Sequence, residues 1–158
     1  MSERMTERLH FEDFHRGQIF QLAEHRIGAG EMIEFASEFD PQPQHLDAEA
    51  AKASILGGLA ASGWYLCALC MRLIVDRLFS RCASMGAPGV EEVQWRKPVF
   101  ADDLLQLEGE VLGSRESSRP DRGYVQWRFS LWRANPPGER VRVMMFVSTV
   151  IIGRKRSG

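Results

Sequence analysis

The chain has 158 residues, of which 44% are hydrophobic and 26% are charged. These fractions are typical of one globular domain and exclude a disordered, collagen-like or coiled-coil chain. The 20 basic and 21 acidic side chains nearly cancel, so there is no strong positive field to attract nucleic acid or an anionic membrane.

The ends of the chain are expected to lie outside the folded domain. Residues 1–10 show no periodic apolar pattern, and residues 1–14 are expected to be a flexible segment. Residues 15–153 are predicted to form a single domain, followed by a basic, solvated tail over 154–158.

The first half of the domain combines a strand with short helices. Residues 19–22 are a candidate strand, and apolar side chains at helical spacing predict a short helix over 31–39. Two prolines in the segment 40–45 disfavour regular helix and favour an extended link. Asp47 can then cap a short helix over 48–53.

Residues 55–71 contain no charged side chain. This run is at the lower length limit for a membrane span. Its glycines and the charged residues after it favour a buried core helix instead, which we expect over 59–79. Cys67 and Cys70 form a C-x-x-C within this run. With no second ligand pair they indicate structural thiols and no metal site.

Beyond the turn expected at 86–89, apolar and polar residues alternate with the period of a strand. The alternating segments surround 93–95, 105–111, 125–131 and 141–152, and the last becomes apolar on both faces. Trp95, in the first of them, is expected in the core.

The element order predicts an α+β domain with an antiparallel sheet packed on one long helix. A single helix cannot cover both faces of such a sheet, and its edges need protection. Both arguments favour a homodimer. Reduced cysteines and the lack of a signal peptide indicate the cytoplasm.

Asp40 and His45 are the first candidates for chemistry. A carboxylate and an imidazole on a proline-stiffened link can face one cleft and share a water molecule. An imidazole can exchange a proton in either direction at neutral pH. The alternative is that Asp40 only ends a helix while His45 lies on the surface.

Gly57 and Gly58 are the second candidates, because they precede the expected long helix. The first amides of a helix lack intrahelical partners, and glycine allows a ligand to approach the backbone closely. Such an amide can stabilise a developing oxyanion. An ordinary turn with close helix–sheet packing is the alternative explanation.

Residues 39–47 read FDPQPQHLD. They resemble the motif G-D-x-N-P-[aliphatic]-H-x-D of the MaoC-like dehydratases, with Asp40 and His45 at its aspartate and histidine. Phe39, Gln42 and Gln44 depart from the glycine, asparagine and aliphatic residue of the motif. Gln42 retains an amide that can orient the site, whereas Gln44 makes one wall polar.

Two further stretches carry the same resemblance, which covers about residues 15–153. ILGGL at 55–59 is similar to the family's approach to its central helix, with Gly58 at the oxyanion glycine. RKPVFADDL at 96–104 is similar to the signature R-P-V-x-x-G-D-x-L.

The resemblance implies a hot-dog fold, with an antiparallel sheet of five or six strands wrapped around one long central helix, and a homodimer. It also implies reversible hydration of 2-enoyl thioesters of coenzyme A. Asp40 and His45 would activate water, and the Gly58 amide would polarise the thioester carbonyl. Coenzyme A would enter only as part of the substrate, with no separate cofactor.

Two other functions remain open at this point. A hot-dog thioesterase usually needs a carboxylate on or beside the central helix, and the expected helix has none before Asp76. A non-catalytic module that binds acyl thioesters is the third hypothesis, and the departures at Phe39 and Gln44 keep it open.

Overall fold

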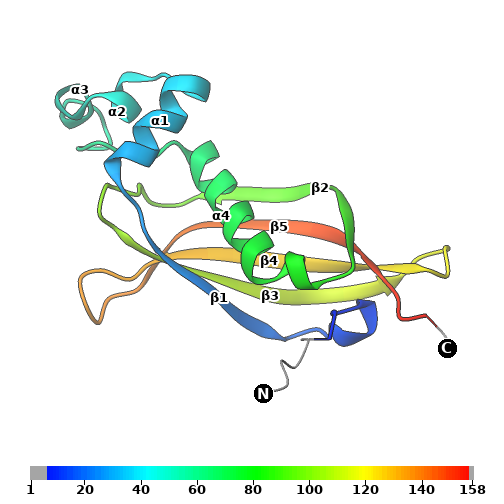
Figure 1. Ribbon diagram of the computed structural model, residues 1–158. Helices are drawn as coiled ribbons and strands as arrows, with labels where there is room; N and C mark the ends of the chain where they lie inside the picture. Colours follow the sequence, from blue (N-terminus) through cyan, green and yellow to red (C-terminus); the bar gives the residue numbers. More distant parts are fainter. Residues whose placement is uncertain (1–6, 157–158) are drawn as a thin grey trace, which may run out of the picture.

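The computed structural model describes residues 7–156. Its framework is one antiparallel sheet of five strands in the order β1-β3-β4-β5-β2 (Figure 1). The strands are β1 (Ile19–Arg26), β2 (Ser84–Trp95), β3 (Leu104–Glu116), β4 (Arg122–Arg133) and β5 (Val141–Gly153). Strand β5 pairs with β4 on one side and β2 on the other, so both of its edges are hydrogen-bonded within the sheet.

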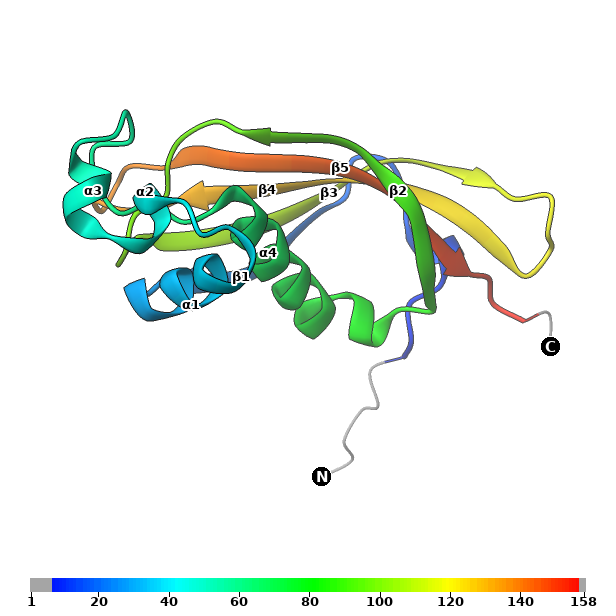
Figure 2. The same cartoon turned by 90° about the horizontal axis from the view of Figure 1, so that it is seen from above.

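One long helix, α4 (Gly63–Arg77), crosses one face of this curved sheet. Figures 1 and 2 show the sheet bending around the helix. The predicted hot-dog arrangement is therefore confirmed. Within residues 7–156, no helix combines the length and the hydropathy needed to span a bilayer.

The core lies between α4 and the concave face of the sheet. It is built from alternate residues of the central strands, whose side chains all point to one face. The helix contributes Leu66, Leu69, Cys70 and Ile74, and the two central strands contribute Val125, Trp127, Phe129, Leu131, Met144 and Phe146.

The beginning of the long helix differs from the sequence prediction. The apolar run predicted a helix over 59–79, but α4 starts at Gly63 and ends at Arg77. Ala60 pairs instead with Phe100 in an isolated β-bridge. A backbone pairing distant in sequence therefore holds this end of the run extended.

The expectation of a wholly buried helix was also wrong. Trp64, Met71 and Val75 are among the exposed large apolar side chains. They recur at helical spacing and form one stripe of α4. The sheet covers only the opposite stripe, so this one is left uncovered in the single chain.

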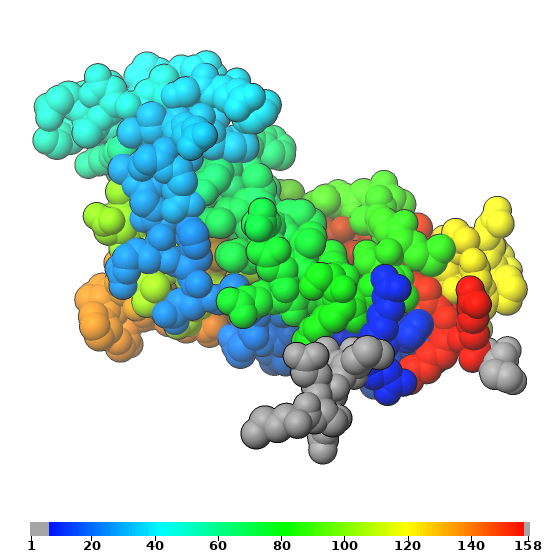
Figure 3. All heavy atoms as spheres, in the orientation of Figure 1, coloured from blue at the N-terminus to red at the C-terminus, as the bar shows by residue number. Residues whose placement is uncertain are grey.

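Helices α1 (Ala29–Phe39), α2 (Pro43–Leu46) and α3 (Ala48–Lys52) gather at one end of the molecule. They form a lobe beside the beginning of α4, seen at the upper left of Figure 3. Asp47 caps α3 through hydrogen bonds from the amides of Glu49 and Ala50, as predicted. Residues 40–45, which were expected to be extended, include most of the single helical turn of α2. Pro43 does not prevent this turn, because it occupies the first helical position, where proline is tolerated.

Two segments expected to be irregular are ordered parts of the structure. Residues 7–14 include a bridge from Leu9 to Cys82, the 3-10 turn η1 (Phe11–Asp13) and the buried Phe14. Arg154 and Lys155 form ion pairs with acidic side chains of η1. Residues 1–6 and 157–158, which also belong to the expected flexible ends, lie outside the described residues.

The turn expected at 86–89 lies within edge strand β2, after the 3-10 turn η2 (Phe79–Arg81). Register shifts against β5 occur at this point. The glycines and proline of residues 86–89 therefore mark irregular pairing of edge strand β2 with β5, and the chain does not reverse its direction there.

We expect the far half of α4 to supply stability. Replacing the fully buried Ile74 by alanine should lower the free energy of unfolding by about 2–5 kcal/mol, through lost burial and a residual cavity. Urea denaturation followed by circular dichroism measures this change. Ile55→Ala, the same substitution at a fully exposed position, is the matched control and should change stability by only about 0.5 kcal/mol. Equal losses in both variants would contradict the assignment of the buried face.

Candidate functional site

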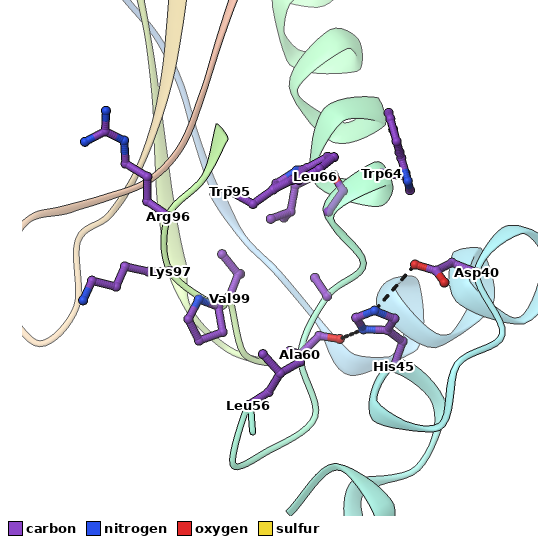
Figure 4. Close-up of a pocket in the computed structure, with 13 residues that line it drawn as sticks. Asp40, His45, Leu56, Ala60, Trp64, Leu66, Trp95, Arg96, Lys97 and Val99 are labelled. Atoms are coloured by element: carbon purple, nitrogen blue, oxygen red, sulfur yellow. Dashed lines mark hydrogen bonds and ion pairs between the residues drawn. The ribbon is translucent and has the colours of Figure 1, made fainter. Parts of the chain in front are cut away.

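Asp40 and His45 approach each other at the junction of α1 and α2. Asp40 is the C-cap residue of α1, and His45 lies in the single turn of α2. His45 Nε2 is 3.5 Å from Asp40 Oδ2. Figure 4 shows the two side chains pointing toward each other. The structure therefore brings together the two residues predicted to share a water molecule.

A backbone carbonyl determines the orientation of the imidazole. His45 Nδ1 is 2.8 Å from the oxygen of Ala60. A carbonyl oxygen can only accept, so Nδ1 carries the hydrogen. In the neutral ring this leaves Nε2 as an acceptor facing Asp40. The side chain is buried, and its ring is held with Nε2 toward the carboxylate.

The Asp40 carboxylate accepts hydrogen bonds from two other side chains. Gln42 Nε2 donates to Oδ1 at 2.6 Å, and the Ser62 hydroxyl donates to Oδ2 at 2.7 Å. These hydrogen bonds, from Gln42 first and Ser62 second, hold the pKa of Asp40 below its usual value against the opposing effect of burial. Asp40 is therefore ionised at neutral pH.

Ser62 is a site residue that the sequence analysis missed. It is the N-cap residue of α4, but its side chain makes no cap hydrogen bond. A serine just before an apolar helix predicts an ordinary cap. Only the fold shows that its hydroxyl is turned to Asp40.

The carboxylate and imidazole line a cavity of about 400 Å³. This size is within the range of small-molecule sites. Its other walls come from the residues before α4, the first turns of α4 and the end of β2. They are mostly apolar: Leu56, Ala60, Ala61, Gly63, Trp64, Leu66, Trp95, Pro98 and Val99, with Arg96 and Lys97 pointing away from the pair in Figure 4.

Trp95 was expected in the core, but it lines this cavity and is 44% exposed. Strand β2 is an edge strand, so one side of the indole has no neighbouring strand. The other side lies against the beginning of α4, where Trp95 Nε1 donates to the oxygen of Gly63 at 3.0 Å.

Gly57 and Gly58 belong to the segment before α4 and are not among the residues that line the cavity. Gly57 has a φ of 74°, which favours glycine, and Gly58 faces the ring of Phe100. Because α4 begins at Gly63, the argument from helix-terminal amides now applies to Gly63 and Trp64. A role for Gly58 as oxyanion donor stays a prediction from the family motif.

The cysteines of α4 offer no alternative centre. Cys70 is fully buried, and burial raises the pKa of its thiol, so it packs as a small apolar group. In the part of the chain that the structure describes, no three His, Cys, Asp or Glu side chains lie together as metal ligands would.

We expect loss of either hydrogen-bond donor to raise the pKa of Asp40. Ser62→Ala and Gln42→Leu each remove a donor that favours the charged carboxylate, so each should shift its titration to higher pH. Carbon-13 NMR of the Asp40 side-chain carboxyl as a function of pH measures this shift. Ser54→Ala is the control, because this hydroxyl donates to the oxygen of Ala51. An unchanged Asp40 titration in both site variants would refute the proposed electrostatic role.

Comparison with known proteins places this geometry in a family. Residues 16–132 match the family described as MaoC like domain. The uncharacterized protein YdeM of Bacillus subtilis (strain 168) is 30% identical over 114 residues, which are 72% of this chain and 80% of that protein.

Solved structures of proteins with this fold support the same family assignment. A MaoC-like dehydratase from Rhodospirillum rubrum is 38% identical with a TM-score of 0.80, over 94% of this chain and 99% of that one. The unliganded (R)-hydratase PhaJ1 of Pseudomonas aeruginosa shares the fold, with a TM-score of 0.70, 21% identity and coverage of 94% and 88%. The chain therefore belongs to the MaoC-like family of hot-dog proteins.

Proposed function

We propose that the protein catalyses reversible addition of water to a 2-enoyl thioester of coenzyme A. The observation that carries this proposal is the pairing of ionised Asp40 with His45 at an apolar cavity. Hydration of an enoyl group needs a polar site for water beside an apolar site for the acyl chain. Family membership and the fold shared with an (R)-hydratase support the same reaction.

The pair is suited to hold the attacking water. Nε2 of neutral His45 and the carboxylate of Asp40 are both acceptors and lie 3.5 Å apart. One water can donate a hydrogen to each. In the proposed step its oxygen bonds to C3 of the enoyl group while the Asp40–His45 pair accepts one proton. The electrons of the double bond move toward the thioester oxygen, and the pair then returns the proton to C2.

The thioester oxygen becomes negative during this step and needs a hydrogen-bond donor. Ser62 does not cap α4, so the amides of its first turn receive no side-chain cap from it. Gly63 and Trp64 of this turn line the cavity. We therefore propose their amides as donors beside the Gly58 amide of the family motif. One such donor typically lowers a barrier by about 3 kcal/mol.

The alternatives predict different products. A thioesterase would direct water at the carbonyl carbon and release free coenzyme A. A binding module would retain the cavity without turnover. The close approach of an ionised Asp40 to His45 favours hydration over binding alone, because simple binding of an acyl chain does not require an ionised carboxylate in the site.

We expect Asp40→Asn to lower kcat/KM for hydration of crotonyl-CoA by about 10²-fold or more. The amide keeps the shape of the side chain but cannot accept the proton. Loss of absorbance from the conjugated thioester measures the rate, and a thiol reagent detects free coenzyme A.

Glu38→Gln is the matched control, because it makes the same chemical change at an exposed position of α1. It should retain the wild-type rate. Release of coenzyme A without hydration would support the thioesterase instead. Binding without turnover of any enoyl-CoA would support the binding module.

We also propose a homodimer that covers edge strand β2 and the exposed stripe of α4. Within residues 7–156 no further strand pairs with the outer edge of β2. Met85 and Val90 of β2 are exposed together with Met71 and Val75 of α4. An uncovered edge beside apolar surface favours association with a second copy.

Sedimentation velocity should give twice the mass of the chain for the wild-type protein. Val90→Lys should shift the population to the monomer. A wild-type monomer at high concentration would contradict the proposal.

A further inference from the structure

We propose that Trp95 ends the acyl-binding site and restricts the protein to short-chain acyl thioesters. This inference rests on the proposed function, because it names the length of the acyl group bound at the same site. It comes from the position of the indole between two cavities on the concave side of the sheet. The first contains Asp40 and His45, and the second, of about 270 Å³, contains neither.

The second cavity lies farther along α4 and β2. Its lining includes Met71 of α4, Ser84 and Gly86 of β2, and Phe146 and Val150 of β5. These residues are mostly apolar, so the cavity offers no group for catalysis but is suitable for hydrocarbon.

The order of residues along the helix places the two cavities in line. Gly63 lines the first cavity and Met71 the second. Residues four apart lie on one face of a helix, so Cys67 lies between them on that face. The Cys67 sulfur is 3.9 Å from the Met144 sulfur of β5, so the helix and the sheet are in contact at this level.

The strands give the same order. Trp95 of β2 is paired with Met144 of β5, and the next pair on the same face is Val93 with Phe146. Trp95 lines the first cavity and Phe146 the second. The indole therefore stands with Cys67 and Met144 in the partition that separates them. In Figure 4 it forms the wall of the catalytic cavity that faces along α4.

The indole is held firmly in this position. Its Nε1 donates to the Gly63 oxygen at 3.0 Å, and a Cβ on Gly63 would come within 2.5 Å of the ring. The ring of Trp64 packs edge-on against it, with centroids 5.1 Å apart. A hydrocarbon chain entering from the catalytic end thus meets a fixed aromatic wall rather than a mobile side chain.

The test measures binding of saturated acyl-CoAs by isothermal titration calorimetry, which needs no turnover. Wild-type protein should bind butyryl-CoA and hexanoyl-CoA more tightly than decanoyl-CoA. Trp95→Ala should join the two cavities, so each methylene that newly enters apolar surroundings should improve affinity by about fourfold. Its affinity for decanoyl-CoA relative to butyryl-CoA should therefore rise at least about tenfold. Trp95→Leu should show a smaller shift in the same direction and provides a second variant if Trp95→Ala does not fold.

Met71→Phe is the matched control, because it reduces the second cavity without touching the first. Alone, it should leave butyryl-CoA binding unchanged. Combined with Trp95→Ala, it should remove the gain for decanoyl-CoA. Tight wild-type binding of decanoyl-CoA, or a gain in Trp95→Ala that survives Met71→Phe, would overturn the inference.

Hydration of crotonyl-CoA, measured in parallel, separates this inference from the proposed function. A length limit in binding that depends on Trp95, with no hydration of any enoyl-CoA, would overturn only the hydratase proposal. Hydration of crotonyl-CoA and decenoyl-CoA at equal kcat/KM would support the reaction and overturn the length limit. Failure to bind or hydrate any acyl-CoA would overturn both.

Discussion

The hydrogen bond from Ser62 to Asp40 connects the two halves of the site. Asp40 ends α1, and Ser62 precedes α4. The bond therefore joins the small helical lobe to the long helix and favours the charged carboxylate. It also has a cost for α4. An N-cap serine that bonds to its own helix contributes about 1 kcal/mol, and here that contribution is given up. In return, the first-turn amides of α4 remain available to a ligand at the edge of the cavity.

Much of the fold could be predicted because the core imposes simple periods on the sequence. Alternation along β3 and β4 follows from one buried and one partly exposed face. The long apolar run indicated α4, and the aspartate at position 47 indicated the start of α3. Asp40 and His45 could be found from local sequence because both lie within one short segment, although the orientation of the imidazole depends on the Ala60 carbonyl.

The features that the sequence did not reveal depend on distant contacts. Residues 59–61 are apolar and include no proline, so their sequence is compatible with helix. The bridge between Ala60 and Phe100 holds this stretch extended instead. Trp95 alternates as a core residue would, and only its place on an edge strand leaves it partly exposed. Composition and spacing describe neither an edge nor a bridge between segments far apart in the chain.

The late start of α4 determines the geometry of the Asp40–His45 site. In a helix that began at Leu59, the Ala60 carbonyl would point along the axis toward the amide of Trp64. It would then no longer point sideways to His45 Nδ1, which it contacts at 2.8 Å. The imidazole would lose the acceptor that keeps Nε2 toward Asp40. By remaining extended, the backbone at Ala60 orients the imidazole, and the helix that starts at Gly63 holds Trp95 at the wall of the cavity. One change from extended chain to helix therefore positions both the groups that we propose to react and the wall that we propose to limit the substrate.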